Sequence, residues 1–125
     1  MAFVFVERGI FVIGTIKENR EFHRAFRRGT CYPSSRVVTY VFKTRAGGVR
    51  IGITTGKKVG NAVTRSRARR VLRAAWRSLE PDVFGNADIV FVARSRTPMC
   101  KSTEVARVLR EQLHAAGLLA REGAK

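Results

Sequence analysis

Residues 57–77 read KKVGNAVTRSRARRVLRAAWR, a stretch rich in lysine and arginine that contains no Asp or Glu. On a helical wheel of about 100° per residue, the apolar side chains gather on one side: Ala68, Val71, Leu72, Ala75, Trp76 and Leu79. Six arginines occupy the rest of the surface: Arg65, Arg67, Arg69, Arg70, Arg73 and Arg77. The pattern predicts a helix that buries one stripe, with Asn61 as its N-cap and Gly60 allowing a close approach before it.

The outer face of this helix is unusual because its charges have one sign. A solvated helix face normally mixes signs and gains from Glu–Lys pairs four residues apart, whereas no Asp or Glu occurs from Lys57 to Ser78. The arginines therefore repel one another until a polyanion binds. A planar guanidinium also grips phosphate with two hydrogen bonds and stacks on bases. We interpret the face as a nucleic-acid contact and not as an ordinary solvated surface.

The composition of the whole chain supports the same partner class. The 125 residues (14.0 kDa) are 45% hydrophobic, enough for one core, and we treat residues 1–125 as a single domain. Lys and Arg number 25 against 9 Asp and Glu, which gives a formal net charge of +16. Such an excess in a small domain points to a polyanion. Nucleic acid is the first candidate and an anionic membrane surface the second.

The cysteines, the histidines and the N-terminus set further limits. Cys31 and Cys100 lack metal-ligand spacing, so we expect free thiols in a reducing compartment, with a single disulfide as the alternative. His23 and His114 are far apart and predict no zinc site. The apolar start, MAFVFVERGIFVIGT, is interrupted by a Glu-Arg-Gly triplet and has no basic leader. It predicts a strand or a docked tail, and a cytoplasmic protein.

The remaining elements follow from local patterns. Asn19 is the expected cap of a helix over residues 20–28 that ends at Gly29. Residues 36–42 and 49–55 predict two strands of one hairpin, joined by a turn at 45–48. The apolar run at 87–93 predicts a central strand buried on both faces, and residues 103–116 predict a last helix. This order is typical of an α+β fold with one mixed sheet, for which a parallel crossover is right-handed by default.

The sequence carries no recognisable catalytic set. A two-metal nuclease needs clustered carboxylates, but the only aspartates are Asp82, in an expected loop, and Asp88, at the start of a strand. No Ser/His/Asp set or phosphate-binding glycine loop is present either. We therefore predict a binding protein with no catalytic residues of its own.

The segment RIGITTGKKVGNAVTRSRARRVLRAAWR resembles the signature region of the protein component of bacterial ribonuclease P. The residues that match that pattern are Lys57, Lys58, Gly60, Asn61, Ala62, Val63, Arg65, Arg67, Arg69, Arg70 and Arg73. ENREFHRAFRRGT is similar to the first helix of the family and DIVFVAR to the strand after the basic helix. The resemblance spans about residues 17–119 and leaves residues 1–15 unassigned. Ser66 replaces an asparagine of the pattern, and Gly56 a frequent serine.

The resemblance implies a fold. It is a two-layer α+β sandwich of three helices on a four-stranded mixed sheet, in the order αβββαβα. The crossover around the basic helix is left-handed, as in a ribosomal protein S5 domain 2-like fold, and this overrides the right-handed default.

The resemblance also implies a function. The protein would be an auxiliary subunit that, with the ribonuclease P RNA subunit, removes the 5′ leader of precursor tRNA. The RNA subunit and substrate would bind Mg²⁺ and carry out the hydrolysis. We expect neither a membrane nor a DNA partner.

Two sets of contact residues are predicted. The RNA-subunit set is Lys57, Lys58, Asn61, Arg65, Arg67, Arg69, Arg70 and Arg73, for docking phosphates of folded RNA. The leader set is Phe22, Phe26, Tyr40, Arg20 and Arg24, because a single strand needs aromatic platforms beside basic side chains. For Phe22 and Phe26, core packing is an equally weighted alternative. The competing functions are a general RNA-binding or ribosome-associated protein, a self-sufficient nuclease and a membrane-surface module.

Overall fold

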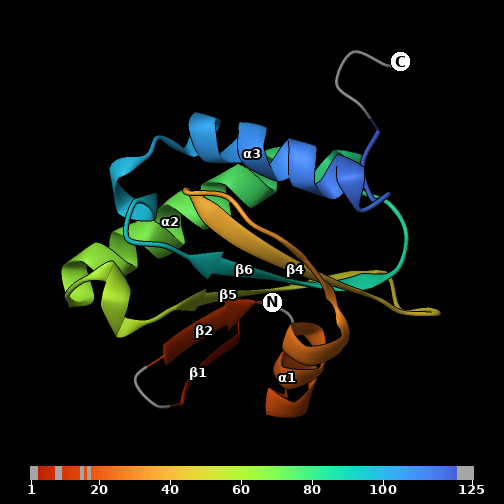
Figure 1. Ribbon diagram of the computed structural model, residues 1–125, viewed down its shortest axis with the longest axis horizontal. Helices are drawn as coiled ribbons and strands as arrows, with labels where there is room; N and C mark the ends of the chain where they lie inside the picture. The colour runs from red at the N-terminus through yellow and green to blue at the C-terminus, as the bar shows by residue number, and fades with distance from the viewer. Residues whose placement is uncertain (1–2, 8–9, 15, 17, 121–125) are drawn as a thin grey trace.

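The computed structural model describes residues 3–7, 10–14, 16 and 18–120 (Figure 1). Six strands form one sheet in the order β1-β2-β5-β6-β4-β3. The strands are β1 Phe3–Glu7, β2 Ile10–Gly14, β3 Thr30–Tyr32, β4 Val37–Lys43, β5 Val49–Thr55 and β6 Ala87–Ala93. The helices are α1 Asn19–Arg28, α2 Ala62–Leu79 and α3 Ser102–Ala115, with short 3₁₀ turns η1 Lys57–Val59, η2 Glu80–Asp82 and η3 Thr97–Met99.

The α+β class and the order αβββαβα are confirmed from α1 to α3. The expected four-stranded mixed sheet is present as β5-β6-β4-β3. The N-terminal segment enlarges it, because β2 pairs antiparallel with β5 and β1 pairs antiparallel with β2. A strand was one of the two structures expected for this segment. The result is a sheet of six strands.

The predicted hairpin of β4 and β5 is wrong, because β6 lies between these strands. Val90 of β6 pairs antiparallel with Tyr40 of β4 and parallel with Gly52 of β5. The physical reason is the apolar character of β6. Four of its residues are fully buried, and an edge position would expose them. The central location predicted for this strand is therefore confirmed.

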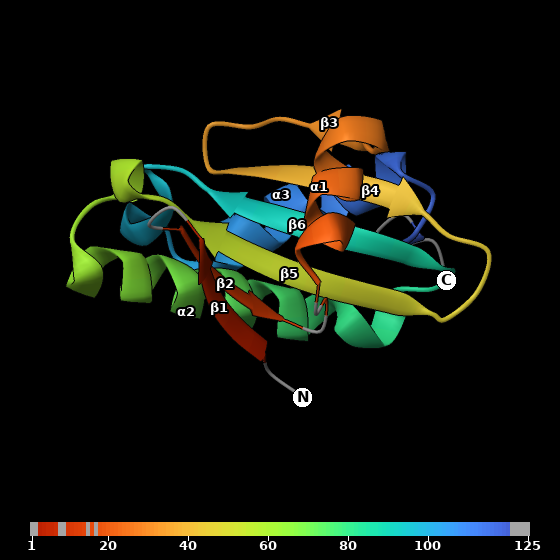
Figure 2. The same cartoon turned by 90° about the horizontal axis from the view of Figure 1, so that it is seen from below.

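The crossover that joins β5 to β6 through α2 has the uncommon hand. Figure 2 shows α1 in front of the sheet and α2 behind it, and in this view the passage from β5 through α2 to β6 is left-handed. The right-handed default is therefore wrong here, and the hand implied by the family resemblance is present. This connection places α2 along the outside of the two parallel strands.

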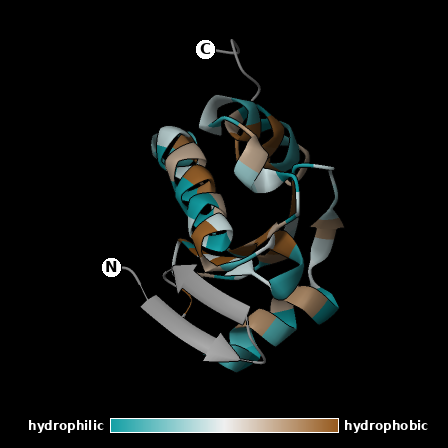
Figure 3. Ribbon diagram, turned by 90° about the vertical axis from the view of Figure 1, so that its left-hand side faces the viewer, coloured by the Kyte–Doolittle hydropathy of each residue, from teal (hydrophilic) through white to brown (hydrophobic). Residues whose placement is uncertain are grey.

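The helices lie on both faces of the sheet (Figures 1 and 2), so α1 adds a layer to the two-layer sandwich that was expected. Helices α2 and α3 cover one face and complete the main core, to which α2 contributes Leu72, Trp76 and Leu79. Figure 3 shows hydrophobic and hydrophilic bands alternating along these helices, as expected for elements with a single buried face. Helix α1 covers the opposite face, where Phe22 and Ala25 pack on Val90.

The ends of α1 differ in detail from the sequence prediction. Glu18, not Asn19, is the N-cap, and its backbone N–H donates to Glu21 Oε1 at 3.2 Å in a capping box. Gly29 ends the helix as predicted, but with an extended φ of −79°. Its role is spatial, since a Cβ there would lie 2.5 Å from the carbonyl oxygen of Ala25 and 2.8 Å from that of Val41.

Truncation of the two phenylalanines of α1 is expected to lower the stability of the protein by different amounts. Phe22 is 4% exposed and its ring lies directly over Gly52, whereas Phe26 is 38% exposed. Phe22→Ala should lower the free energy of unfolding by about 3–5 kcal/mol, because it leaves a core cavity. Phe26→Ala should cost about 1–2 kcal/mol, mainly for the lost aromatic pair with Tyr40. Urea unfolding measures both, and equal losses would contradict this difference in packing.

Candidate RNA-binding surfaces

The chain enters α2 through a glycine turn that brings two lysines beside the helix N-terminus. Lys57 and Lys58 are exposed in η1. Gly60 follows with φ +143°, a region that other residues rarely adopt, and a Cβ there would lie 2.9 Å from Thr64. Asn61 is the N-cap, as predicted, and its side chain accepts a hydrogen bond from the Thr64 N–H at 2.9 Å. The first turn of α2 contains no carboxylate, so the positive end of the helix dipole adds to the lysine charges.

The arginines of α2 divide by exposure. Arg67, Arg70 and Arg77 are exposed, while Arg65, Arg69 and Arg73 are half-buried along the flank of the helix. Burial, together with the neighbouring charges of Arg65, Arg73 and Arg70, lowers the pKa of Arg69. This is the repulsion expected for a helix face that carries charges of one sign. The face therefore gains most from an anion that can be shared among several guanidinium groups.

Two side chains hold arginines of this face in place. Arg69 Nη1 donates to Thr55 Oγ1 of β5 at 3.0 Å, which ties α2 to the sheet. Arg70 Nη1 donates to Ser66 Oγ at 3.1 Å. Ser66, which replaces the asparagine of the family pattern, thus orients a guanidinium one turn further along the helix.

The face of the sheet under α1 is organised in three cross-strand rows. The register aligns Asp88 with Arg50 and Phe42 in the first row, Val90 with Gly52 and Tyr40 in the second, and Val92 with Thr54 and Val38 in the third. Helix α1 crosses over the second row, since the Phe22 ring contacts Gly52 and the Phe26 ring packs on Tyr40. The first and third rows therefore lie on opposite flanks of α1.

An aromatic strip extends from the second row into the third. The rings of Phe26 and Tyr40 meet edge to face with their centroids 5.0 Å apart, and burial, followed by hydrogen bonding with Cys31, raises the pKa of the Tyr40 hydroxyl. Val38 and Val92 continue this surface and are half-buried. We call these four residues the aromatic strip. It offers a ring face and aliphatic side chains, which is the chemistry needed to stack an unpaired base.

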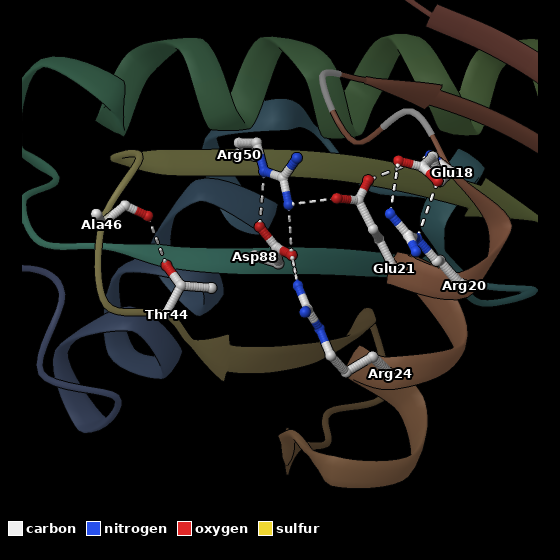
Figure 4. A network of polar contacts seen from close by, with 8 residues as sticks. All are labelled: Glu18, Arg20, Glu21, Arg24, Thr44, Ala46, Arg50 and Asp88. Carbon is white, nitrogen blue, oxygen red and sulfur yellow. Dashed lines mark hydrogen bonds and ion pairs between the residues drawn. The ribbon is translucent and has the colours of Figure 1, made fainter.

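An ion-pair network fills the first row (Figure 4). Asp88, whose side chain is 1% exposed, accepts two hydrogen bonds from Arg50 at 2.9 Å each and one from Arg24 at 3.0 Å. Arg50 also donates to Glu21 of α1 at 2.8 Å. The Arg24 guanidinium lies 4.5 Å from the ring centroid of Phe42. Hydrogen bonding to Asp88 raises the pKa of Arg50.

The structure brings together only part of the predicted leader set. Phe26 and Tyr40 are neighbours, with Phe22 buried beneath the same helix. Arg24 lies on the other flank of α1 in the ion-pair network. Arg20 is exposed, and its Nε lies 2.9 Å from Glu18 Oε1. The RNA-subunit set stays together along η1 and α2, on the face of the sheet opposite α1.

Sequence reasoning missed the ion-pair network. The sequence does contain a signal for it: Asp88 is the one charged residue in the apolar run of residues 87–93, and a buried carboxylate requires partners. Among the residues that the structure describes, no three His, Cys, Asp or Glu side chains gather as a metal site. Within the same part of the chain, no helix is both long and apolar enough to cross a membrane.

Comparison with known proteins agrees with this arrangement. The family model described as Ribonuclease P matches residues 14–117. The chain belongs to the ribonuclease P family. A ribonuclease P protein component from Oceanobacillus iheyensis is 39% identical over 105 residues, which cover 83% of this chain and 87% of the relative. One from Clostridium novyi is 38% identical over 105 residues, covering 82% and 93%.

Solved structures share the fold. The RNase P protein of Staphylococcus aureus superposes with a TM-score of 0.72 at 25% identity, covering 84% of this chain and 96% of that protein. The RNase P protein of Thermotoga maritima gives a TM-score of 0.70 at 22% identity, covering 80% and 94%. The α+β arrangement is therefore that of known ribonuclease P proteins.

Proposed function

We propose that this chain, as the protein component of ribonuclease P, binds the catalytic RNA with one face of its sheet and the leader of precursor tRNA with the other. The observation that carries the proposal is the separation of the two surfaces. The carboxylate-free α2 and the aromatic strip lie on opposite faces of one sheet. Each surface has side chains suited to binding a different kind of RNA.

The α2 face suits folded RNA. Lys57, Lys58 and the arginines of α2 follow one helix and its approach, so they can meet phosphates spaced along a structured backbone. Such binding reads shape and charge and depends steeply on salt through counterion release. Arg69 and Asn61 support this surface from within, since each already makes an intramolecular hydrogen bond.

The aromatic strip suits the single-stranded leader. Phe26 is the more exposed of the two phenylalanine rings of α1, and Tyr40 supports it from the sheet. Stacking of a base on an exposed ring is tolerant of sequence, as a subunit that processes many precursors requires. Phe22 contributes indirectly, by fixing the helix that carries Phe26.

The same proposal assigns hydrolysis to the RNA subunit. Mg²⁺ would be bound by that RNA and the substrate. The described residues offer no carboxylate set for it, and Asp88 is already committed to two arginines. The contribution of the protein is binding and orientation. A general RNA-binding or ribosome-associated role is the alternative, and it predicts RNA affinity without any effect on leader removal.

Reconstitution separates these functions. Precursor tRNA is incubated at low Mg²⁺ with the RNA subunit alone, with this chain alone and with both. We expect specific 5′ cleavage to be fastest with both and absent with the chain alone, checked free of contaminating ribonuclease. Cleavage by the chain alone would identify a self-sufficient nuclease, and no stimulation of the RNA subunit would favour the general RNA-binding role.

Phe26→Ala tests the leader contact. In the reconstituted enzyme it should weaken binding of precursor tRNA by about 1–3 kcal/mol and leave mature tRNA unchanged, because only the precursor carries a leader to stack. The measurement is the ratio of the two affinities. Phe84→Ala is a matched control, since Phe84 is 54% exposed and lies outside α1. A folded Phe26→Ala enzyme with an unchanged ratio would exclude the leader role of this ring.

Arg67→Ala tests the RNA-subunit contact. Loss of one arginine–phosphate contact should reduce the slope of log affinity against log salt by about one for binding to the RNA subunit. Arg107→Ala, which removes an exposed arginine of α3, should leave the slope nearly unchanged. Equal effects of the two substitutions would mean that net charge, and not the α2 face, determines assembly.

A further inference from the structure

The first-row arginines, Arg24 and Arg50, are balanced by carboxylates, unlike the arginines of α2. Arg27 and Arg28, in the last turn of α1, are exposed and lie outside this network. Arg24 and Arg50 share Asp88, and Arg50 also contacts Glu21, so two positive charges meet two negative ones. Arg20 is paired with Glu18 in the same way. The side chains of Arg24 and Arg50 are still 37% and 34% exposed. They are within reach of solvent and RNA, yet their charge is neutralised.

The position of this network relative to the aromatic strip is informative. Arg24 and Phe26 are two residues apart and therefore leave α1 about 200° apart, on opposite sides. Phe26 borders the third row of the sheet, whereas Arg24 and Glu21 reach the first row. A single strand can approach α1 from either flank. On the first-row flank the Phe42 ring is covered by the Arg24 guanidinium, so the exposed ring that a base can stack on is that of Phe26, on the other flank.

We propose that Glu21 and Asp88 determine leader specificity by masking Arg24 and Arg50, so that single-stranded RNA is directed to the aromatic strip. The proposal rests on the leader role proposed above. Without the two carboxylates, the first row would be a site for any phosphate chain. With them, the charges of Arg24 and Arg50 are already neutralised, and RNA that cannot stack on Phe26 gains little from these two arginines.

Stability alone does not require such a network. Buried ion pairs often contribute little beyond what apolar residues of similar volume would, because the charges must be desolvated. The surrounding residues, Phe22, Phe42 and Val90, already pack α1 against the sheet. The masking role explains why a carboxylate, and not an apolar side chain, occupies position 88 near the start of an otherwise apolar strand.

Glu21→Gln is the sharpest test, because a glutamine keeps the capping box and removes only the charge. The full-length protein is titrated with a single-stranded RNA of leader length at several salt concentrations. Unmasking one arginine should steepen the slope of log affinity against log salt by about 0.7, the value for one single-strand phosphate contact. This corresponds to a gain in affinity of about eight-fold at 50 mM salt and about three-fold at 200 mM.

Two comparisons make the result specific. Glu111→Gln on α3 raises the net charge equally but lies across the sheet from α1, and it should leave the slope close to that of the wild type. In a Phe26→Ala background, Glu21→Gln should produce the same gain as in the wild type, because the two surfaces are on different flanks. Thermal unfolding confirms that each variant is folded.

The outcomes are distinguishable. A gain that is steeper in salt, specific to Glu21 and independent of Phe26 supports masking. An unchanged slope, an equal effect of Glu111→Gln or a gain that requires Phe26 overturns it. This assay uses the chain without the RNA subunit, so it tests masking alone. Failure of the proposed subunit role would appear in a different measurement, as a lack of stimulation of the RNA subunit in reconstitution.

Discussion

The structure depends on the burial of β6 between β4 and β5. A strand this apolar must be covered on both faces and paired on both edges, and the parallel pairing with β5 requires a long connection. Helix α2 is that connection. Its apolar stripe completes the core, so its arginine face is left outside on a rigid element. The position of the basic surface therefore follows from the packing of one strand.

The two faces of the sheet differ in how far their positive charges are paired with carboxylates, and the two surfaces are therefore expected to attract RNA in different ways. From Lys57 to Ser78 no carboxylate offsets the lysines and arginines. On the α1 face Glu18, Glu21 and Asp88 are each placed against an arginine. An unbalanced face attracts phosphate at long range and in proportion to charge. The paired arginines of the α1 face act only at contact, where shape and stacking decide what binds.

Much of the fold and of the α2 surface could be predicted from the sequence, because both are determined by local periodicity. The stripe of α2, its Asn61 cap and the central β6 depend on residues close together in the chain. The pairing of β6 between β4 and β5 could not be predicted in this way, since a hairpin of β4 and β5 satisfies the same local signals. The Asp88 network links residues up to 67 positions apart, from Glu21 to Asp88, and local patterns do not report such contacts. Resemblance supplied the handedness of the crossover.

The assignment of the α1 arginines shows where composition misleads. Arg20 and Arg24 each lie two residues from a phenylalanine of α1, and this proximity along the helix suggested a common role. Helix geometry separates them, because residues two positions apart point to opposite sides. Once Arg24 is placed against Asp88, its charge cannot be counted toward RNA binding without also counting the carboxylate. In a basic protein of net charge +16, the arginines of the first row are thus already paired with carboxylates, and the leader contact proposed above depends on the ring of Phe26 and its support by Tyr40.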